Sequence, residues 1–233
     1  MMKQSTFSLL AFSALLALAS CTDAPESDQA KTSEAQAAAD ATAGEAWKVD
    51  TAQSSLVWIG TKVTGYHSGT VPVKAGSLTL RNDSLAAGRF TLDMTRMAVT
   101  GPEGSDDAGN KKLLGHLQSP DFFDVAAHPD ASFEITGVKP FSGTVQDTAV
   151  TRQEALSQYR VPNPTHTISG NLTIKGVSKN IEFPARVTLT GNQLEALAKF
   201  NIDRRQWNIT YPGKPDDLIR DDIHMGIAIR ASK

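Results

Sequence analysis

The five histidines are the first residues whose chemistry could define a site. They stand at positions 67, 116, 128, 166 and 224, and none belongs to a His-x-Glu, His-Glu-x-x-His or Cys-x-x-Cys pattern. Common zinc sites place their ligands at such spacings. The sequence therefore predicts no metal site. His67 lies among glycines, where a backbone or ligand can approach closely, so we retain it as a candidate contact for the polar end of a ligand.

The nucleophiles and carboxylates form no catalytic pattern either. Gly-x-Ser-x-Gly, the turn that exposes a nucleophilic serine in hydrolases, is absent. Four aspartates crowd positions 216, 217, 221 and 222, without the spacing and glycine of a calcium-binding EF-hand loop. A solvated acidic turn, paired with Arg220 or Lys214, is the simpler interpretation. We predict that the protein is not an enzyme and uses no cofactor.

Two arginines beside a tryptophan could contact an anionic group. Arg204 and Arg205 precede Trp207 closely, and guanidinium groups bind phosphates and carboxylates through charge-assisted hydrogen bonds. The alternative is structural, with arginines at a strand end packing over the indole ring. Both interpretations stay open, so Arg204 and Trp207 join His67 as candidate contacts for the polar end of a ligand.

Cys21, the only cysteine, ends a segment that is typical of export signals. Lys3 supplies a positive charge, residues 7–18 are apolar, and small residues follow. Residues 18–21, Leu-Ala-Ser-Cys, resemble the lipobox of bacterial lipoproteins, in which the cysteine is acylated and becomes the N-terminus. We expect residues 1–20 to be a signal peptide and Cys21 to carry acyl chains such as palmitate as a membrane anchor. An ordinary cleavage site that happens to contain cysteine is the alternative.

An anchor of this kind predicts a location in the bacterial cell envelope, with the domain in the periplasm or at the cell surface. Thr22 stands where inner-membrane lipoproteins carry a retention aspartate, which favours the outer membrane. Residues 22–46 contain no Leu, Ile, Val, Phe, Tyr or Trp and include six acids. Segments with so little apolar surface do not fold alone. We predict that residues 21–46 form an acidic disordered tether, with an alanine-rich helix over 35–43 as the alternative.

From Trp47 onward the sequence alternates between apolar and polar residues, as strands with one buried face do. This pattern predicts about eight strands and an all-β sandwich or closed barrel. A short helix is expected over 105–119, with capping aspartates before it and Pro120 after it, and a second short helix or surface excursion over 151–159. The expected strands are residues 55–62, 69–80, 88–97, 131–141, 166–175, 181–190, 194–203 and 222–230.

The inward face of these strands decides whether a barrel has room for a ligand. Small residues at positions 170, 185, 196, 198 and 226 or 228 interrupt an otherwise large apolar face, which suggests an elongated apolar void. A fully packed interior is the alternative. The residues expected to line the void are Phe90, Leu92, Met94, Ile168, Leu172, Ile174, Phe183, Val187, Phe200, Ile202 and Ile227.

The charge pattern excludes some function classes. Residues 47–233 are nearly neutral, with lysines and arginines dispersed, so we expect no nucleic-acid binding, which needs a clustered basic face. A membrane-spanning barrel would need an apolar outer band and a polar lumen. The lipid anchor would be redundant in such a protein, so we expect the barrel not to span the membrane.

Four stretches together carry a family resemblance. They are residues 58–62 with 65–70, 116–124 (His-Leu-Gln-Ser-Pro-Asp-Phe-Phe-Asp), 170–177 (Gly-Asn-Leu-Thr-Ile-Lys-Gly-Val), and 200–204 with 207–209. Through them, residues 47–233 resemble the YceI-like family of exported lipid-binding proteins. The resemblance implies an extended, antiparallel, eight-stranded, lipocalin-like barrel that holds a polyisoprenoid of the quinone or prenyl-pyrophosphate type. His128 before Pro129 and the long stretch 141–166 depart from the family pattern.

The sequence thus predicts a lipid-anchored protein of the cell envelope that carries or sequesters an isoprenoid lipid without converting it. The alternative, from a different functional class, is a protein-interaction module whose barrel is filled. Pairing of two copies through an outer face of the barrel would give a homodimer, and the sequence leaves this open.

Overall fold

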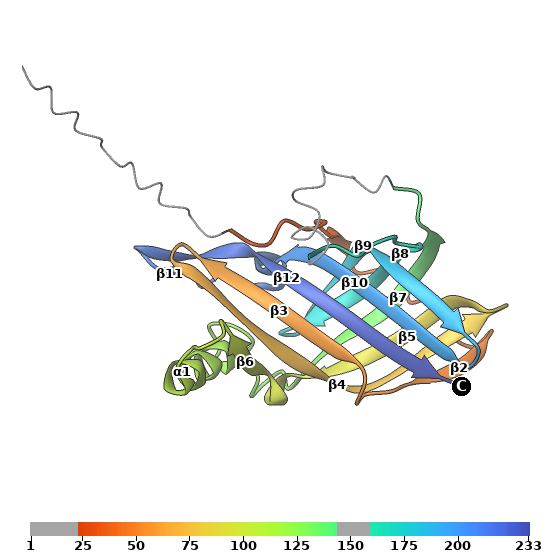
Figure 1. Cartoon of the computed structure of the whole chain (residues 1–233), viewed down its shortest axis with the longest axis horizontal. Coiled ribbons are helices and arrows are strands. Elements are labelled where there is room, and N and C mark those ends of the chain that lie inside the picture. Colours follow the sequence, from red (N-terminus) through yellow and green to blue (C-terminus); the bar gives the residue numbers. More distant parts are fainter. Residues whose placement is uncertain (1–22, 144–158) are drawn as a thin grey trace, which may run out of the picture.

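Eight long strands form a closed antiparallel barrel in the computed structural model, which describes residues 23–143 and 159–233 (Figure 1). Each strand pairs with the next, and the last pairs with the first. All eight expected strands and the all-β class are confirmed. In order around the barrel the strands are β3 (Ser55–Lys62), β4 (Gly65–Arg81), β5 (Ser84–Asp93), β7 (Asp130–Pro140), β8 (His166–Ile174), β9 (Val177–Thr190), β10 (Gln193–Asp203) and β12 (Asp217–Ser232).

Tight turns fix the register of two of the hairpins. Asn82 and Asp83 join β4 to β5, and Lys175 and Gly176 join β8 to β9, and all four residues have φ between 50° and 73°. Two consecutive residues with positive φ match the twist of the flanking strands. The register then sets which side chains face inward, because side chains alternate along a strand.

Shorter elements complete the barrel ends. β2 (Glu45–Val49) pairs with both β12 and β4, β6 (Ala98–Gly101) pairs with β4, and β11 (Gly213–Lys214) pairs with the start of β12. Two 3-10 turns, η1 (Met94–Arg96) and η2 (Arg204–Trp207), follow β5 and β10. No helix among residues 23–143 and 159–233 has the length and apolar character needed to cross a membrane.

The expected helix over 105–119 is confirmed as α1 (Asp107–Gln118), which lies at one end of the barrel (Figure 1). Asp106 caps it by accepting hydrogen bonds from the backbone N–H groups of Ala108 and Gly109. Its last turn is closed by Ser119, whose Oγ donates to the His116 carbonyl at 2.7 Å. The expected helix over 151–159 falls almost entirely on residues outside the described part of the chain.

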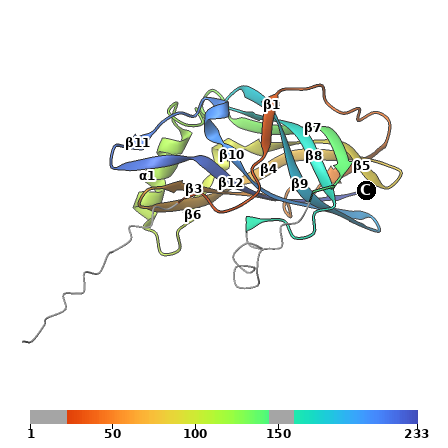
Figure 2. The same cartoon turned by 90° about the horizontal axis from the view of Figure 1, so that it is seen from above.

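Residues 23–46 differ from the predicted disordered tether. They run along the outer wall and include β1 (Lys31–Glu34), which pairs antiparallel with β9 (Figure 2). Ala30 is buried, and its N–H donates to the Asn201 carbonyl at 2.9 Å. The Asn171 side chain binds both the N–H and the carbonyl of Gln36. The prediction of disorder is therefore wrong for residues 23–46, and the alternative helix over 35–43 is also absent.

The physical reason for this order lies in the barrel wall. β9 pairs with β10 only over Ala185–Thr190. Along the rest of both strands, the backbone groups that face the neighbouring strand need other hydrogen-bond partners. Residues 28–34 supply the partners: β1 bonds β9, while Asp28 and Ala30 bond Asn201 of β10. Buried backbone groups need hydrogen bonds whatever the side chains are. We call residues 23–46 the strap.

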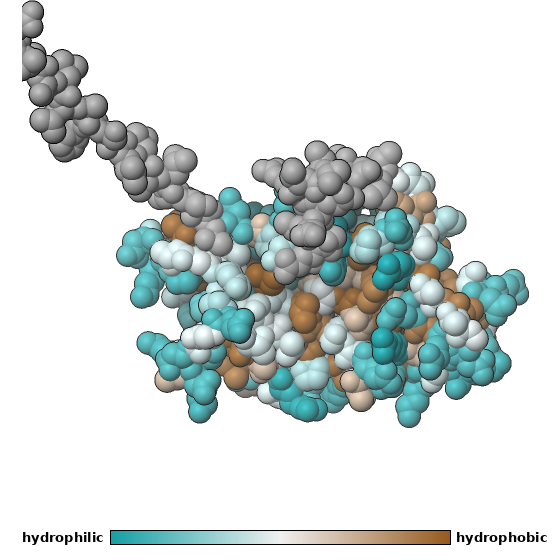
Figure 3. Space-filling view, in the orientation of Figure 1, coloured by the Kyte–Doolittle hydropathy of each residue, from teal (hydrophilic) through white to brown (hydrophobic). Residues whose placement is uncertain are grey.

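The outer face of the barrel mixes polar and apolar side chains (Figure 3). Val57, Tyr66 and Leu218 are the large hydrophobic residues exposed among those described, with exposed fractions of 41 to 46%. The inward faces supply the core, in which Leu56, Phe200 and Ile229 are almost fully buried. This inward and outward separation is the alternation that predicted the strands.

Candidate ligand-binding cavity

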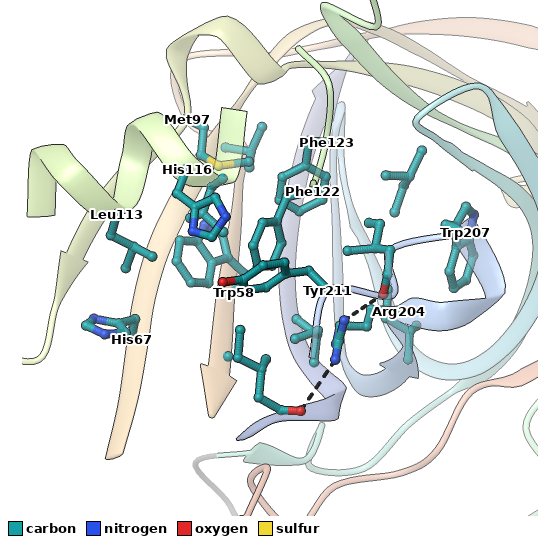
Figure 4. A pocket seen from close by; sticks show the side chains of 18 of the residues that line it. Trp58, His67, Met97, Leu113, His116, Phe122, Phe123, Arg204, Trp207 and Tyr211 are labelled. Carbon is teal, nitrogen blue, oxygen red and sulfur yellow. Dashed lines mark hydrogen bonds between the residues drawn. The ribbon is translucent and has the colours of Figure 1, made fainter. Parts of the chain in front are cut away.

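The barrel end covered by α1 contains an apolar cavity of about 340 Å³. Its walls come from β3, β4, β12, α1 and the segment after α1, and Figure 4 shows their side chains converging on one space. Ligand pockets in proteins span roughly 300 to 1,000 Å³. Characteristic lining residues are Trp58, Met97, Leu113, Phe122, Ile174 and Met225.

The mouth of the cavity lies between α1 and the hairpins β3–β4 and β11–β12. Lys62 and Asp217 form an ion pair at this rim, and Thr64 donates to Asp217 through its N–H and hydroxyl at 3.1 and 2.9 Å. The hydrogen bond from Lys62 is the main cause that lowers the pKa of Asp217. Lys62 and Asp217 therefore neutralise each other's charge at the mouth. The apolar interior is then the main feature that would attract a ligand.

An aromatic cluster of His116, Phe122 and Tyr211 forms part of the cavity wall. The His116 ring contacts Phe122 and Tyr211 edge-on, with centroids 4.9 and 4.7 Å apart, and Phe122 and Tyr211 lie 5.4 Å apart. His116 Nε2 also lies 3.2 Å from Asp121 Oδ2. Edge-on aromatic contacts favour defined ring positions. The cluster therefore ties α1 to the loop before β11.

The other half of the barrel is packed. Phe90, Phe133, Phe183 and Phe200 form a row of rings with successive centroid distances of 5.4, 5.7 and 4.2 Å, and the void beside them measures about 40 Å³. A Cβ built on Gly170 would lie 2.2 Å from Phe133 Cζ. Gly170 therefore accommodates an aromatic ring, while Ala185, Ala196 and Ala198 border only the small void. The elongated void predicted from these small residues is wrong for this half. We call the two regions the open half and the packed half.

The residues expected to line the lumen divide between these halves. Leu92, Met94, Leu172, Ile174 and Ile202 line the cavity of the open half. Phe90, Ile168, Phe183 and Ile227 instead border the small void of the packed half. Val187 and Phe200 border neither space.

Two of the three candidate contacts for a polar ligand group are engaged within the protein. Arg204 is buried and donates to the carbonyls of Ile209 at 2.7 Å and Arg220 at 3.1 Å, and to Asp221 at 3.0 Å. Burial lowers the pKa of its guanidinium, which Asp221 counteracts. Trp207 is fully buried and donates its indole N–H to the Leu172 carbonyl at 2.9 Å. Both residues line the cavity, but their polar groups hold the protein together.

His67 differs from Arg204 and Trp207. Its side chain lines the cavity, and its Nδ1 is buried without a hydrogen-bond partner among the described residues. Burial is the main cause that lowers the pKa of His67, and the Lys62 charge adds to it. A hydrogen bond with the Gly101 backbone opposes this lowering of the pKa. Of the three candidates, His67 alone keeps a buried polar atom without a protein partner.

Three of the four crowded aspartates, Asp217, Asp221 and Asp222, have structural partners. Asp221 pairs with Arg204 and Arg205, and Asp222 accepts a hydrogen bond from Gln29 of the strap at 3.3 Å. Arg220 forms an ion pair with Asp23 at 3.0 Å, and the expected pairing of the acidic turn with Arg220 or Lys214 stays a prediction. No group of three or more potential metal ligands gathers within residues 23–143 and 159–233.

Sequence reasoning missed several residues of the open half. Trp58 could have been included, because it alternates in register with Leu56 on the inward face of an expected strand. Phe122 and Tyr211 lie in irregular segments, where no periodicity indicates direction. Met97 follows the 3-10 turn η1, which replaces the end of the expected strand over 88–97. Their contribution depends on how α1 folds over the barrel end.

Comparisons with known proteins agree with the fold. Burkholderia cenocepacia BcnA is similar over 79% of this chain and 99% of its own, with 18% identity and a TM-score of 0.58. A polyisoprenoid binding domain from Saccharophagus degradans, implicated in plant cell wall breakdown, is similar over 80% of this chain and 97% of its own, with 11% identity and a TM-score of 0.55.

A curated relative extends the comparison to sequence. A UPF0312 protein of Azotobacter vinelandii is 33% identical over 104 residues, which are 42% of this chain and 44% of the relative. The match thus spans less than half the length of that relative. The YceI-like domain model matches residues 47–231, which include all eight barrel strands except the last residue of β12. The chain belongs to the YceI-like domain family.

Proposed function

We propose that the open half binds the hydrocarbon chain of an isoprenoid lipid, and that the protein carries or sequesters this lipid in the bacterial cell envelope without converting it. The observation that carries the proposal is the apolar cavity of about 340 Å³ with a mouth beside α1. The Saccharophagus degradans domain of the same fold is described as polyisoprenoid binding, which supports a ligand of this class.

The energetics favour an apolar chain. Each five-carbon isoprene unit removed from water contributes on the order of 4 kcal/mol gross, at about 0.8 kcal/mol per carbon. Polar atoms buried along the chain without partners would oppose binding. A few units are therefore enough for tight binding, and the packed half limits how far a long chain can extend inward.

The strap supports a membrane-proximal role. Asp23, the first described residue, pairs with Arg220, which is adjacent to Ile219 of the cavity wall. A lipid anchor on Cys21 would be joined to the strap two residues before Asp23. Because one acyl chain anchors only marginally and two or more anchor stably, a lipoprotein anchor would hold the mouth near the membrane surface. The lipid would then have only a short path from the bilayer into the cavity.

Extraction of the native protein tests the proposal. Full-length protein, purified from envelopes in mild detergent, is extracted with organic solvent and the extract is analysed by mass spectrometry. We expect an isoprenoid in near-stoichiometric amount. Extracts without any lipid enriched over a detergent-treated control protein would favour the interaction module, whose filled barrel resembles the packed half.

The anchor has its own test. The Cys21→Ser variant should lose labelling by radioactive palmitate and should leave the membrane fraction. Retention of the variant in the outer-membrane fraction would contradict anchoring through Cys21. This result would leave ligand binding unaffected, because the cavity residues begin at Leu56.

A further inference from the structure

The exposed hydrophobic residues of the barrel gather on one side of its outer wall. Among the described residues the large ones are Val57 on β3, Tyr66 on β4 and Leu218 on β12, with exposed fractions of 41, 44 and 46%. β3 pairs with β4 along one edge and with β12 along the other, so the three residues lie on neighbouring strands (Figure 1). Hydrophobic residues scattered singly need no partner, whereas contiguous ones mark interaction surfaces.

Strand alternation extends this side between the three residues. Trp58 lines the cavity, so its chain neighbours Val57 and Ile59 face outward. Residues directly opposite on a neighbouring strand share that face, and on β4 these are Thr70 and Ser68. Figure 3 shows mainly white and brown surface over the middle of β3. We call the following outward residues, none of which is charged, the β3 face: Val57, Ile59, Tyr66, Ser68, Thr70 and Leu218.

The strap covers a different side of the wall. It crosses β12, β10, β9, β8 and β7, where ion pairs such as Lys31 with Glu182 and Glu34 with Lys179 accompany it. Within the described part of the chain, none of its hydrogen bonds or ion pairs reaches β3. The charged side of the barrel is therefore covered by the chain itself, and the β3 face is left open.

The described chain begins at the edge of the β3 face. Asp23 pairs with Arg220 at 3.0 Å, and Arg220 is two residues from Leu218 along β12. Residues 1–22 precede Asp23, and residues 7–18 among them are apolar. A membrane anchor in this segment, as proposed above, would be joined to the barrel at this edge. The β3 face is then the part of the wall that meets the membrane first.

The size and chemistry of the β3 face suit a bilayer better than a second copy of the chain. Its three exposed side chains offer roughly 200 Å², whereas a stable complex buries about 800 Å² per partner. A bilayer requires no complementary shape, and tyrosine is favoured where apolar and polar layers meet. The lack of charged side chains avoids the cost of burying an unpaired charge. With an anchor supplying most of the affinity, a small apolar face is enough to orient the barrel.

We infer that the β3 face rests on the surface of the lipid bilayer, with Tyr66 and Leu218 entering the headgroup region. Both residues belong to the hairpins beside the cavity mouth, β3–β4 and β11–β12, so this contact holds the mouth at the membrane. Such an orientation rests on the proposed function, because it needs an anchor, and it adds the residues that hold the barrel in place.

Site-specific quenching in vesicles tests this contact. Full-length protein acylated on Cys21 receives one free thiol by Thr70→Cys or Thr188→Cys, is labelled with a nitrobenzoxadiazole dye, and is reconstituted into phosphatidylcholine vesicles that contain a nitroxide-labelled lipid. Thr188 is exposed on β9, so Thr188→Cys is the matched control. We expect at least threefold stronger quenching at position 70 than at position 188, whereas an anchor alone would give equal quenching.

Variants of the β3 face identify the contact. Val57→Asp places a charge in the middle of the face and should reduce quenching at position 70 to the level at position 188. Tyr66→Ser combined with Leu218→Ser should have the same effect by removing apolar area, and it gives the answer if Val57→Asp fails to fold. Thr190→Asp, at an exposed position of β9, is the charge control and should leave quenching unchanged.

Ligand binding is measured separately. Phytol, a branched C20 alcohol, is the probe ligand, and its dissociation constant is determined by fluorescence displacement with the full-length protein in detergent. Val57, Tyr66 and Leu218 are not part of the cavity wall, so the variants should bind phytol as tightly as the wild-type protein does.

The outcomes distinguish the membrane contact from the proposed function. Equal quenching at positions 70 and 188 would overturn the contact and leave lipid binding intact. Shielding of position 70 from both the nitroxide lipid and an aqueous quencher would overturn it in favour of a second copy of the chain. Loss of the full-length protein from the vesicles would contradict the proposed anchor and the contact with it. Absence of phytol binding with position 70 still quenched would contradict only the proposed ligand.

Discussion

The two halves of the barrel are built from the same kinds of strand yet have different interiors. In the packed half, four phenylalanine rings fill the space that small residues leave, and the remaining void is about 40 Å³. In the open half, an apolar cavity of about 340 Å³ remains beside α1. The position of the aromatic rings, and not the number of small residues, therefore determines where a ligand fits. The packed half should supply stability, and the open half should supply binding.

Removing a ring from the packed half should have the largest effect. Phe183 stacks on Phe200 with centroids 4.2 Å apart and is almost fully buried. Phe183→Ala should cost about 3 to 5 kcal/mol of unfolding free energy, as large-to-small core substitutions do, measured by urea denaturation. Leu113→Ala, at the half-buried wall of the open half, should cost only about 1 kcal/mol. Similar losses of unfolding free energy in both variants would contradict the division into a stabilising packed half and a binding open half.

Acidic pH should lower the stability of the barrel through the buried His224. His224 is buried between Asn201 and Tyr159, and burial, with a smaller contribution from Lys199, lowers the pKa of His224 to about 4. The unfolded chain binds this proton near pH 6.5, so stability is full above pH 6.5 and declines as pH falls toward 4. The loss of unfolding free energy should reach about 3 kcal/mol, because each unit of the pKa shift corresponds to about 1.36 kcal/mol.

Urea midpoints between pH 7 and 4 measure this decline. His224→Gln keeps a side chain that can bond Asn201 and does not titrate, so it should remove most of the slope that His224 contributes. An unchanged slope in the variant would assign the acid sensitivity to other groups.

Filling the open half should abolish binding without loss of the fold. A Cβ on Gly60 would meet its nearest neighbour, Ile223 Cδ1, at 3.6 Å, which is an ordinary contact. Gly60→Phe would then extend a ring into the cavity and should weaken phytol binding by more than about tenfold, or about 1.4 kcal/mol. Gly115→Phe on the exposed face of α1 is the control and should bind normally. An unchanged affinity of the Gly60→Phe variant for phytol would mean that the ligand binds outside the open half.

The smallest effect is expected at the strap. Asn171 holds the backbone of Gln36 through two hydrogen bonds of 2.7 and 3.0 Å at an exposed site. Asn171→Ala should cost about 1 kcal/mol and should speed amide hydrogen exchange at Gln36, with phytol affinity unchanged. Unaltered exchange at Gln36 would mean that the β1 pairing alone orders the strap.

The strands and the helix could be predicted because their signals are local. Alternation sets the faces of β8 and β9, Gly176 marks their turn, and Asp106 with Pro120 bounds α1. The strap could not be predicted from side-chain hydrophobicity, because backbone pairing with β9 and the Asn171 amide order it. Such contacts join residues far apart in the chain.

The cavity was only partly predictable for a related reason. Gly170 was expected to leave a void, and Phe133 on the neighbouring strand fills it. Leu172 and Ile174, two and four residues along the same strand, do line the cavity. Whether the space beside a small residue is filled depends on the residue opposite it on the neighbouring strand. The register that sets this pairing is a property of the closed barrel.

A crystal structure of the protein saturated with phytol tests the central claim most directly. The account predicts continuous electron density for the chain in the open half, between Trp58, Leu56 and Val71, with the row of phenylalanine rings undisturbed. Chain density within the packed half or on the outer wall, with the open half collapsed, would contradict it.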